Sequence, residues 1–393
     1  MKVITVESAY HSITFSLFST IDDVCLATGK IDRIGLLNGF LTLSYQDENV
    51  KEDVNYETHL DAVKGILELL QSLNLLTSFQ ELQAIGHKIL RGTHFYEEPI
   101  IIDDSFLNEL EELKDLRSLP VMGELLGIKA FQEVFPEVSS IAVFDSSFYK
   151  DLPEENYLYA VPYHWYHDFG VRKYGYHGLS HSYVNSQMKS LLGKEEYRLI
   201  SCHLGESVSI SAVKDGKCID TSMGFSPLSG AIMSYRSGDI DSSIIPYIMQ
   251  KEGKSASEVI VDLNHNSGLL GLSEFSSEIE DILHQSMEAN EKAVLAKNKY
   301  IRSIVNYISN YYVLLNGIDA IAFTGEIGEK SVSLRREICE KLSCLGVKMN
   351  LDKNSDSLVC APIQSEDSDV DIYIIPHDRH LLIWKAMKDL LNR

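Results

Sequence analysis

The sequence predicts two α/β domains built on the same plan. The chain has 393 residues, which is long for one hydrophobic core and comfortable for two. Short stretches with strand-like alternation are followed by stretches with helical periodicity, as in α/β proteins. A set of short strands over residues 198–220 repeats the arrangement of a set over residues 2–30. Such a repeat is what a duplicated domain leaves behind.

The first domain is expected to begin with an antiparallel meander. Three strands are predicted over residues 2–7, 12–18 and 24–30, separated by short polar breaks. A helix is predicted over 56–76, where leucines recur on one face, and a buried strand over 140–144. We expect this domain to cover residues 1–145, with residues 381–393 added from the end of the chain.

The second domain is expected over residues 149–376 and opens with its own meander. Strands are predicted over 199–204 and 208–214, and Asp215-Gly216 is a strong hairpin turn that leads to a strand over 217–220. The elements expected after it, to the end of the chain, are a helix over 294–315 stopped by Gly317, a strand over 318–324, a loop over 325–328, a helix over 333–345, an acidic loop over 365–371, a strand over 372–375 and a helix over 381–391.

The composition excludes several kinds of partner. The net charge is −22, and a nucleic acid or an anionic membrane surface would need an excess of Lys and Arg. No apolar run is as long as a membrane span. The six cysteines show no metal-ligand spacing, and most lie in apolar runs. These features predict a cytoplasmic protein with reduced thiols.

Three segments carry a recognisable chemistry. They are RKYGYHG at 172–178, CHLGES at 202–207 and DTSMGFSPL at 220–228, which continues into RSGDID at 236–241. With these segments the sequence resembles the acetate kinase family over almost the whole chain. The resemblance implies a duplicated RNase H-like, actin-like (ASKHA) fold with a cleft between its domains. It also implies a homodimer through the second domain, and transfer of a phosphoryl group between ATP and a small carboxylate with Mg²⁺.

The resemblance assigns four catalytic positions. His177 matches the histidine that contacts the transferring phosphoryl group, and Arg236 matches the arginine that pairs with the carboxylate or the phosphoryl oxygens. Asp145 matches the carboxylate proposed to bind Mg²⁺. Lys88 stands where the family has a second arginine, so it keeps the charge and loses the bidentate fork. Outside these motifs, each would be interpreted as an ordinary hydrogen-bonded or ion-paired residue.

The resemblance also assigns a pocket for the acyl group. Leu90, Leu119, Tyr176 and Pro227 occupy the matching positions, and they are equally consistent with plain core residues. Leu90 and Tyr176 are bulkier than the family's usual residues, which favours a small acyl group. Pro120 stands at the place of an active-site histidine.

The phosphate, nucleotide and metal positions depart from the family pattern. His203, Gly205 and Gly328 are kept, and Glu278 stands at an Asp of the segment that covers the base. Substituted positions are Glu7 and Glu206 in the two phosphate loops (Asn in the family), Glu280 and Glu326 around the nucleotide (Arg and Gly in the family) and Arg379 at the metal-binding Glu.

Together these substitutions predict that ordinary ATP–Mg²⁺ binding is lost or strongly reduced, because carboxylates repel a polyphosphate. Three functions stay open at this point. The first is an acetate kinase-type phosphotransferase that needs Mg²⁺ and has unusual residues. The second is a non-catalytic dimeric homologue, a pseudoenzyme with a binding or regulatory role. The third is a carboxylate kinase that uses another donor, such as pyrophosphate.

Overall fold

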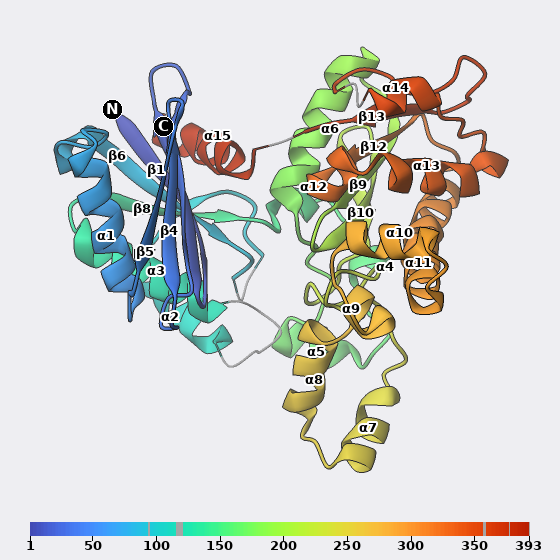
Figure 1. The fold of residues 1–393 in the computed structure, drawn as a ribbon, viewed down its shortest axis with the longest axis horizontal. Helices are drawn as coiled ribbons and strands as arrows, with labels where there is room; N and C mark the ends of the chain where they lie inside the picture. Colours follow the sequence, from blue (N-terminus) through green and yellow to red (C-terminus); the bar gives the residue numbers. More distant parts are fainter. Residues whose placement is uncertain (93–94, 115–120, 357–358, 377, 393) are drawn as a thin grey trace. The chain divides into compact units, whose positions relative to one another are not determined.

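The computed structural model describes residues 1–92, 95–114, 121–356, 359–376 and 378–392 (Figure 1). The chain divides into two compact units. Unit 1 consists of Met1–Ser147 and Asp378–Arg393, and unit 2 is Phe148–His377.

Unit 1 is built on a mixed sheet of eight strands within the described residues. The strands are ordered β5-β4-β3-β2-β1-β6-β8-β7 across the sheet. The first five are joined as antiparallel neighbours, whereas β1, β6 and β8 run parallel to one another. The strands are β1 (Lys2–Ala9), β2 (Ser12–Ser19), β3 (Cys25–Asp32), β4 (Gly39–Tyr45), β5 (Glu48–Val54), β6 (Leu82–Ile89), β7 (Ile100–Ile101) and β8 (Ser139–Phe144).

Helices cover both faces of this sheet. The helical segments of unit 1 are α1 (His59–Ser72), η1 (Phe79–Glu81), α2 (Asp104–Leu113), α3 (Val121–Val134), η2 (Ser147–Tyr149, which crosses into unit 2) and α15 (Arg379–Leu391). A side chain at Gly86 would collide with Met387 of α15, while the next residue, His87, packs its ring against Phe131 of α3. Because successive residues of a strand point to opposite faces, α3 and α15 lie on opposite sides of the sheet (Figure 1).

The sheet of unit 2 repeats the core of the first. Its strands are ordered β11-β10-β9-β12-β13, with an antiparallel meander followed by two parallel strands. The same pattern relates β3, β2, β1, β6 and β8 of unit 1, so the predicted duplication is confirmed. The strands are β9 (Arg198–Leu204), β10 (Val208–Lys214), β11 (Lys217–Thr221), β12 (Ala320–Thr324) and β13 (Asp371–Ile374).

Two long helices of unit 2 pack on its sheet. Helix α6 (Gly178–Leu192) contacts β9 and β12, and α11 (Glu291–Leu314) contacts β9 and β10. The other helical segments are α4 (Glu154–Tyr157), α5 (Tyr163–Phe169), α7 (Ile244–Glu252), α8 (Ala256–His265), α9 (Gly268–Ser273), α10 (Ile279–Met287), α12 (Gly325–Lys330), α13 (Val332–Lys341), η3 (Ser343–Leu345) and α14 (Leu351–Ser355).

The structure corrects two predicted elements. The segment 325–328 is not a loop, because helix α12 begins at Gly325. Its first N–H donates to Oε1 of Glu329 (3.1 Å), and Glu326 pairs with Lys330 one turn later. These contacts outweigh the low helix propensity of its glycines. The helix predicted over 333–345 ends at Lys341 and gives way to a 3₁₀ turn. Among the described residues, no helix has both the length and the apolar character that crossing a bilayer requires.

Candidate active site

The site residues of unit 1 gather where three parallel strands end. Glu7 lies near the end of β1, Lys88 near the end of β6, and Asp145 directly after β8. Since the strands are parallel and adjacent, their carboxyl ends share one edge of the sheet. The Nζ of Lys88 lies 3.6 Å from Oε2 of Glu7 and 3.6 Å from Oδ2 of Asp145. Three of the residues singled out in the sequence are thus brought together.

A fourth predicted residue, Arg379, reaches the same cluster from the start of α15. Its Nη1 lies 3.5 Å from Oε2 of Glu7. Burial raises the pKa of Glu7, but the charges of Lys88 and Arg379 outweigh it and hold that pKa at about 2. Likewise, burial lowers the pKa of Lys88, while Asp145 and Glu7 act more strongly and raise it. Glu7 and Lys88 are therefore ionised at neutral pH.

Glu7 and Arg379, the two residues of this cluster whose charges differ from the family pattern, carry opposite charges. Glu7, Lys88, Asp145 and Arg379 carry two negative and two positive charges. The family pattern described above has Asn, Arg, Asp and Glu at these positions, which is one positive charge and two negative charges. The cluster is therefore less negative than that pattern. Glu7 does not simply add repulsive charge, as was expected from the sequence, because it forms an ion pair with Lys88.

A buried carboxyl group that no sequence motif indicated lies close to this cluster. Glu124, in α3, is 5% exposed. Its Oε1 accepts a hydrogen bond from the backbone N–H of Leu90 (2.8 Å), and its Oε2 has no hydrogen-bond partner among the described residues. Burial, and secondarily the charge of Asp145, raise the pKa of Glu124 to about 8. Glu124 thus carries a proton at neutral pH and anchors the backbone of a predicted acyl-pocket residue.

In unit 2, His177 occupies a strained position at the start of a long helix. It is the N-cap of α6, with φ 58° and ψ 27° in the left-handed region. That conformation is costly for a residue other than glycine and persists where the surroundings impose it. The N-terminus of a helix attracts anions, because its first N–H groups are not used within the helix. His177 is therefore held where an anionic group would be favoured.

The ring of His177 belongs to a cluster of histidines and serines. Its Nδ1 lies 2.8 Å from Oγ of Ser209, and the ring stacks on that of His203 with 4.1 Å between the centroids. His203 and Ser209 are register partners on β9 and β10, so their side chains are neighbours on one face. The Nδ1 of His203 lies 2.9 Å from Oγ of Ser180 in α6. Two predicted site residues thus meet, bound by serines that the sequence did not single out.

Arg236 comes from a loop that is fixed on both sides. Its Nη1 donates to Oγ of Ser207 (2.8 Å). Burial lowers the pKa of Arg236, and the nearby Glu206 opposes that shift. The loop is closed by a hydrogen bond from the N–H of Gly230 to Oδ1 of Asp239 (2.8 Å). The salt bridge of Arg236 with Asp239 or Asp241 that would make it a purely structural residue is not formed among the described residues.

The acyl-pocket positions in unit 2 are buried and held by backbone contacts. The hydroxyl of Tyr176 donates to the carbonyl of Phe225 (2.7 Å). The hydroxyl of Tyr149 donates to the carbonyl of Tyr176. Pro227, two residues after Phe225 in the sequence, is buried. Leu90 belongs to unit 1, and Leu119 and Pro120 lie outside the described residues.

The nucleotide positions are surface residues. Glu326 and its partner Lys330 are 77% and 74% exposed, with 2.9 Å between charged atoms. Glu278 caps α10, and Glu280 lies in its first turn; both are exposed, as is Glu206. Gly205 and Gly328 are buried. Within the residues described, no group of three or more His, Cys, Asp or Glu is placed to hold a metal ion.

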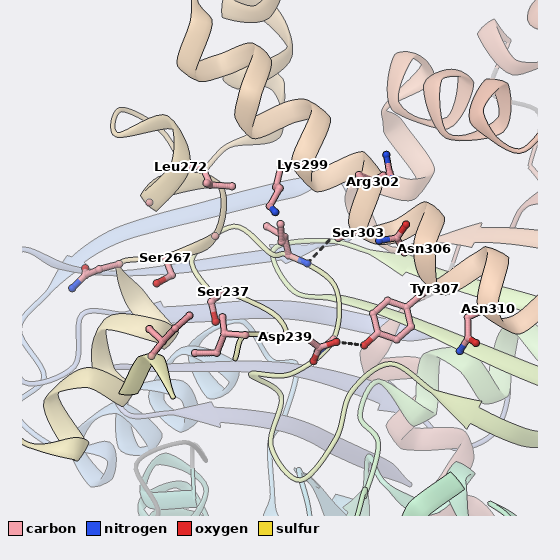
Figure 2. Close-up of a pocket in the computed structure, with 17 residues that line it drawn as sticks. Ser237, Asp239, Ser267, Leu272, Lys299, Arg302, Ser303, Asn306, Tyr307 and Asn310 are labelled. Carbon is pink, nitrogen blue, oxygen red and sulfur yellow. Dashed lines mark hydrogen bonds between the residues drawn. The ribbon is translucent and has the colours of Figure 1, made fainter. Parts of the chain in front are cut away.

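A large cavity of unit 2 adjoins the loop that carries Arg236, since Gly230, Ser237 and Asp239 line it. It has a volume of about 860 Å³ and lies beside α11 (Figure 2). Asp239 and Tyr307 point toward each other in it and are joined by a hydrogen bond, and the backbone N–H of Ile232 donates to Ser303 (3.1 Å). None of the residues that line it is a site residue predicted from the sequence.

Comparison with known proteins agrees with the arrangement. The sequence pattern of the acetokinase family matches residues 2–385. An acetate kinase of Anoxybacillus flavithermus is 40% identical, covering 100% of this chain and 99% of that protein. An acetate kinase of Bacillus subtilis is 40% identical, covering 97% of each. Among solved structures, a propionate kinase of Francisella tularensis superposes with a TM-score of 0.92 at 31% identity over 98% of each chain.

The acetate kinase of Porphyromonas gingivalis gives a TM-score of 0.90 at 30% identity over 99% of each chain. With the two matching sheets, these likenesses confirm the duplicated α/β fold of the ASKHA class. The chain belongs to the acetokinase family.

Proposed function

We propose that this protein transfers a phosphoryl group between a small carboxylate and a phosphoryl donor, and that it uses ATP–Mg²⁺ poorly. The observation that supports the transfer most directly is that three groups of unit 2, His177, His203 and Arg236, are each held by a hydrogen bond with a serine. Three cationic or hydrogen-bonding groups held in place suit a transition state whose charge spreads over three phosphoryl oxygens.

The proposed step is a displacement at phosphorus. A carboxylate oxygen forms a bond to phosphorus while the bond from phosphorus to the bridging oxygen of the donor breaks, and its electron pair stays on the donor. The guanidinium of Arg236 orients the carboxylate or a phosphoryl oxygen with two parallel N–H groups. His177 donates to a phosphoryl oxygen at the helix N-terminus. Within unit 1, Lys88 is the cation that would act on a phosphoryl oxygen as a point charge.

The residues of unit 1 fit a magnesium ion that arrives with its substrate. Mg²⁺ is usually held by one or two carboxylates together with phosphate oxygens. Asp145 and Glu7 are the carboxylates that would hold it, and Oε1 of Glu7 is buried without a hydrogen-bond partner among the described residues. When bound, the ion would neutralise phosphate charge. Arg379 pairs with Glu7.

The proposed weak use of ATP depends on the carboxylates at the phosphate and nucleotide positions. Glu206 is exposed and acts electrostatically on Arg236, so a polyphosphate would meet a carboxylate beside its binding cation. The charge of Glu326 is largely balanced by Lys330, and this residue therefore contributes less. A non-catalytic binding protein and a kinase with another donor remain alternatives. The ion pairs of Glu7 with Lys88 and Arg379 favour the former, because they satisfy the cluster without a ligand.

A thermal-shift series separates these functions. A ligand that binds the folded state raises the melting temperature. We expect acetyl phosphate to raise it and ATP–Mg²⁺ to have a much smaller effect at equal concentration. A shift with pyrophosphate–Mg²⁺ alone would favour the other donor. No shift with any of the three would contradict the proposed transfer and favour a binding role.

We further propose a homodimer formed through unit 2. Apolar side chains lie exposed along α7 and α11, at Ile244 (42%), Tyr247 (57%), Leu295 (55%) and Val313 (76%). Large apolar side chains that are exposed to solvent on a unit are candidates for an interaction surface.

A further inference from the structure

Four side chains of unit 2 form a hydrogen-bonded chain that ends at His177. The Nδ1 of His177 lies 2.8 Å from Oγ of Ser209, whose Oγ lies 2.7 Å from Nε2 of His181. The Nδ1 of His181 lies 2.8 Å from Oγ of Ser201. All three distances are those of true hydrogen bonds.

The periodicities of the helix and of the strands bring the four side chains of this hydrogen-bonded chain together. His177 and His181 are four residues apart at the start of α6, so their side chains lie on one helix face. Ser201 is two residues before His203 on β9, and Ser209 pairs with His203 across the sheet, so both serines share one sheet face. Ser201, Ser209 and His181 are fully buried.

The hydrogen bonds of this hydrogen-bonded chain can have either of two donor–acceptor orientations. Ser209 has one hydroxyl proton and contacts two ring nitrogens, so it donates to one ring and accepts from the other. In the forward direction, Ser201 donates to His181, His181 donates to Ser209, and Ser209 donates to Nδ1 of His177. The proton of a neutral His177 ring then sits on Nε2. In the reverse direction, Nδ1 of His177 is protonated and Nε2 is bare.

We propose that Ser201, His181 and Ser209 are positioning residues that hold His177 as a donor, with its proton on Nε2. The inference rests on the proposed function, since it takes the partner of Nε2 to be a phosphoryl oxygen. Such an oxygen is anionic and accepts hydrogen bonds, whereas a bare ring nitrogen facing it would repel it. Burial strengthens the effect, because no water competes for the hydroxyl groups and an unmade bond is costly.

The direction of the chain can be read without turnover. In protein labelled with ¹⁵N-histidine, long-range ¹H–¹⁵N spectra separate bare from protonated ring nitrogens, and a His177→Gln variant assigns the signals. We expect bare Nδ1 and protonated Nε2 at His177 in the unchanged protein. Ser209→Ala should let the other tautomer appear, whereas Ser209→Thr, which keeps a hydroxyl on a β-branched residue suited to a strand, should not.

Ser211→Ala is the matched control. Ser211 is buried on the same face of β10 and bonds Oγ1 of Thr221 (3.2 Å) rather than a histidine, so its loss should leave the His177 tautomer unchanged. Ser201→Ala breaks the far end of the chain and serves if Ser209→Ala does not fold. A protonated Nδ1 in the unchanged protein, or the same tautomer with and without the Ser209 hydroxyl, would overturn the inference.

A kinetic measurement adds a second readout. Ser209→Ala should lower kcat for acetyl phosphate formation roughly tenfold, which corresponds to one neutral hydrogen bond, with a smaller change in KM. Ser211→Ala should change neither. If the unchanged protein has no transferase activity, the proposed function fails, and the spectra still decide which way the chain runs.

Discussion

Lys88 is placed 3.6 Å from Glu7 and 3.6 Å from Asp145, so one ammonium group neutralises carboxylates carried by the two strands that flank its own strand, β6. Its side chain is 17% exposed. This relationship links the stability of unit 1 to the chemistry that we propose, because the same cation would meet a phosphoryl oxygen.

Removing that cation should destabilise the protein. Lys88→Met leaves two carboxylates without their shared partner, and we expect the free energy of unfolding to fall by roughly 3 kcal/mol. Lys189→Met is the control, because the pair of Lys189 with Glu195 is largely exposed and is worth less than about 1 kcal/mol. Denaturant titration at pH 7 measures both. Equal losses in the two variants would show that the ion pairs of Lys88 contribute nothing special.

Restoring an arginine should raise activity. Lys88→Arg keeps the charge and adds a fork that can bind two oxygens at once. We expect kcat to rise and the stability to stay close to that of the unchanged protein, as measured by steady-state kinetics with acetate and by denaturant titration. An unchanged kcat would indicate that this cation does not touch the reacting group.

The pH dependence of stability should reveal Glu124. Its pKa is about 8 in the folded protein, against an ordinary value of 4.5. The folded state therefore keeps a proton that the unfolded chain has lost, and its stabilising contribution is complete below pH 4.5 and disappears as pH rises toward 8. Relative to Glu124→Gln, the unchanged protein should lose about 3–5 kcal/mol across that window.

Denaturant titrations from pH 5 to pH 8.5 check this, with Glu133→Gln on the exposed side of the same helix as the control. The slope against pH should differ between the unchanged protein and Glu124→Gln, and should not differ for Glu133→Gln. Parallel curves for all three would show that Glu124 is ionised throughout.

ATP binding should return only when the compensating pair is exchanged together. Glu7→Asn alone leaves Arg379 near the cluster without its carboxylate, so we expect little gain. Glu7→Asn with Arg379→Glu and Glu206→Asn should tighten ATP–Mg²⁺ binding roughly tenfold or more, because Arg379→Glu supplies a metal carboxylate in place of Glu7 and removes a cation that repels Mg²⁺, while Glu206→Asn removes a carboxylate that repels the polyphosphate. Calorimetry measures this. Micromolar binding by the unchanged protein would refute the proposed exclusion of ATP.

The oligomeric state tests the exposed apolar surface of unit 2. Light scattering should give the mass of a dimer at micromolar concentration, and Ile244→Glu with Tyr247→Glu should give a monomer, because charges buried at an interface are costly. Ile21→Glu, at an apolar residue of unit 1 that is 87% exposed, should remain a dimer. A monomeric unchanged protein would contradict the proposal.

The fold could be predicted where alternation and turns were clear. Strands β1, β2, β9 and β10 lie within two residues of their predicted bounds, because apolar residues alternate there. Strands β4 and β5 were not predicted. In β5 most side chains are exposed and charged, so its register is set by pairing with β4 rather than by its own pattern.

The candidate site, like the fold, could be predicted where the signal is local in the sequence and not where it depends on distant partners. His177 and Arg236 could be singled out from the sequence because their motifs are local, and their roles stay predictions. Ser209 and Glu124 acquire their roles from partners far along the chain, through strand register and through packing of α3 on the sheet. No local pattern distinguishes such a residue from an ordinary buried polar group.

The most direct test of the proposed transfer is a hydroxylamine-trapping assay for acetyl phosphate, run with acetate and each phosphoryl donor, for the unchanged protein and for Arg236→Ala and Arg236→Lys. Arg236 is the guanidinium that the proposal places on the reacting carboxylate or phosphoryl group. We predict measurable acetyl phosphate formation by the unchanged protein, a loss of roughly a thousandfold or more in Arg236→Ala and partial activity in Arg236→Lys. No product from any donor, or equal rates in the unchanged protein and Arg236→Ala, would contradict the proposed transfer.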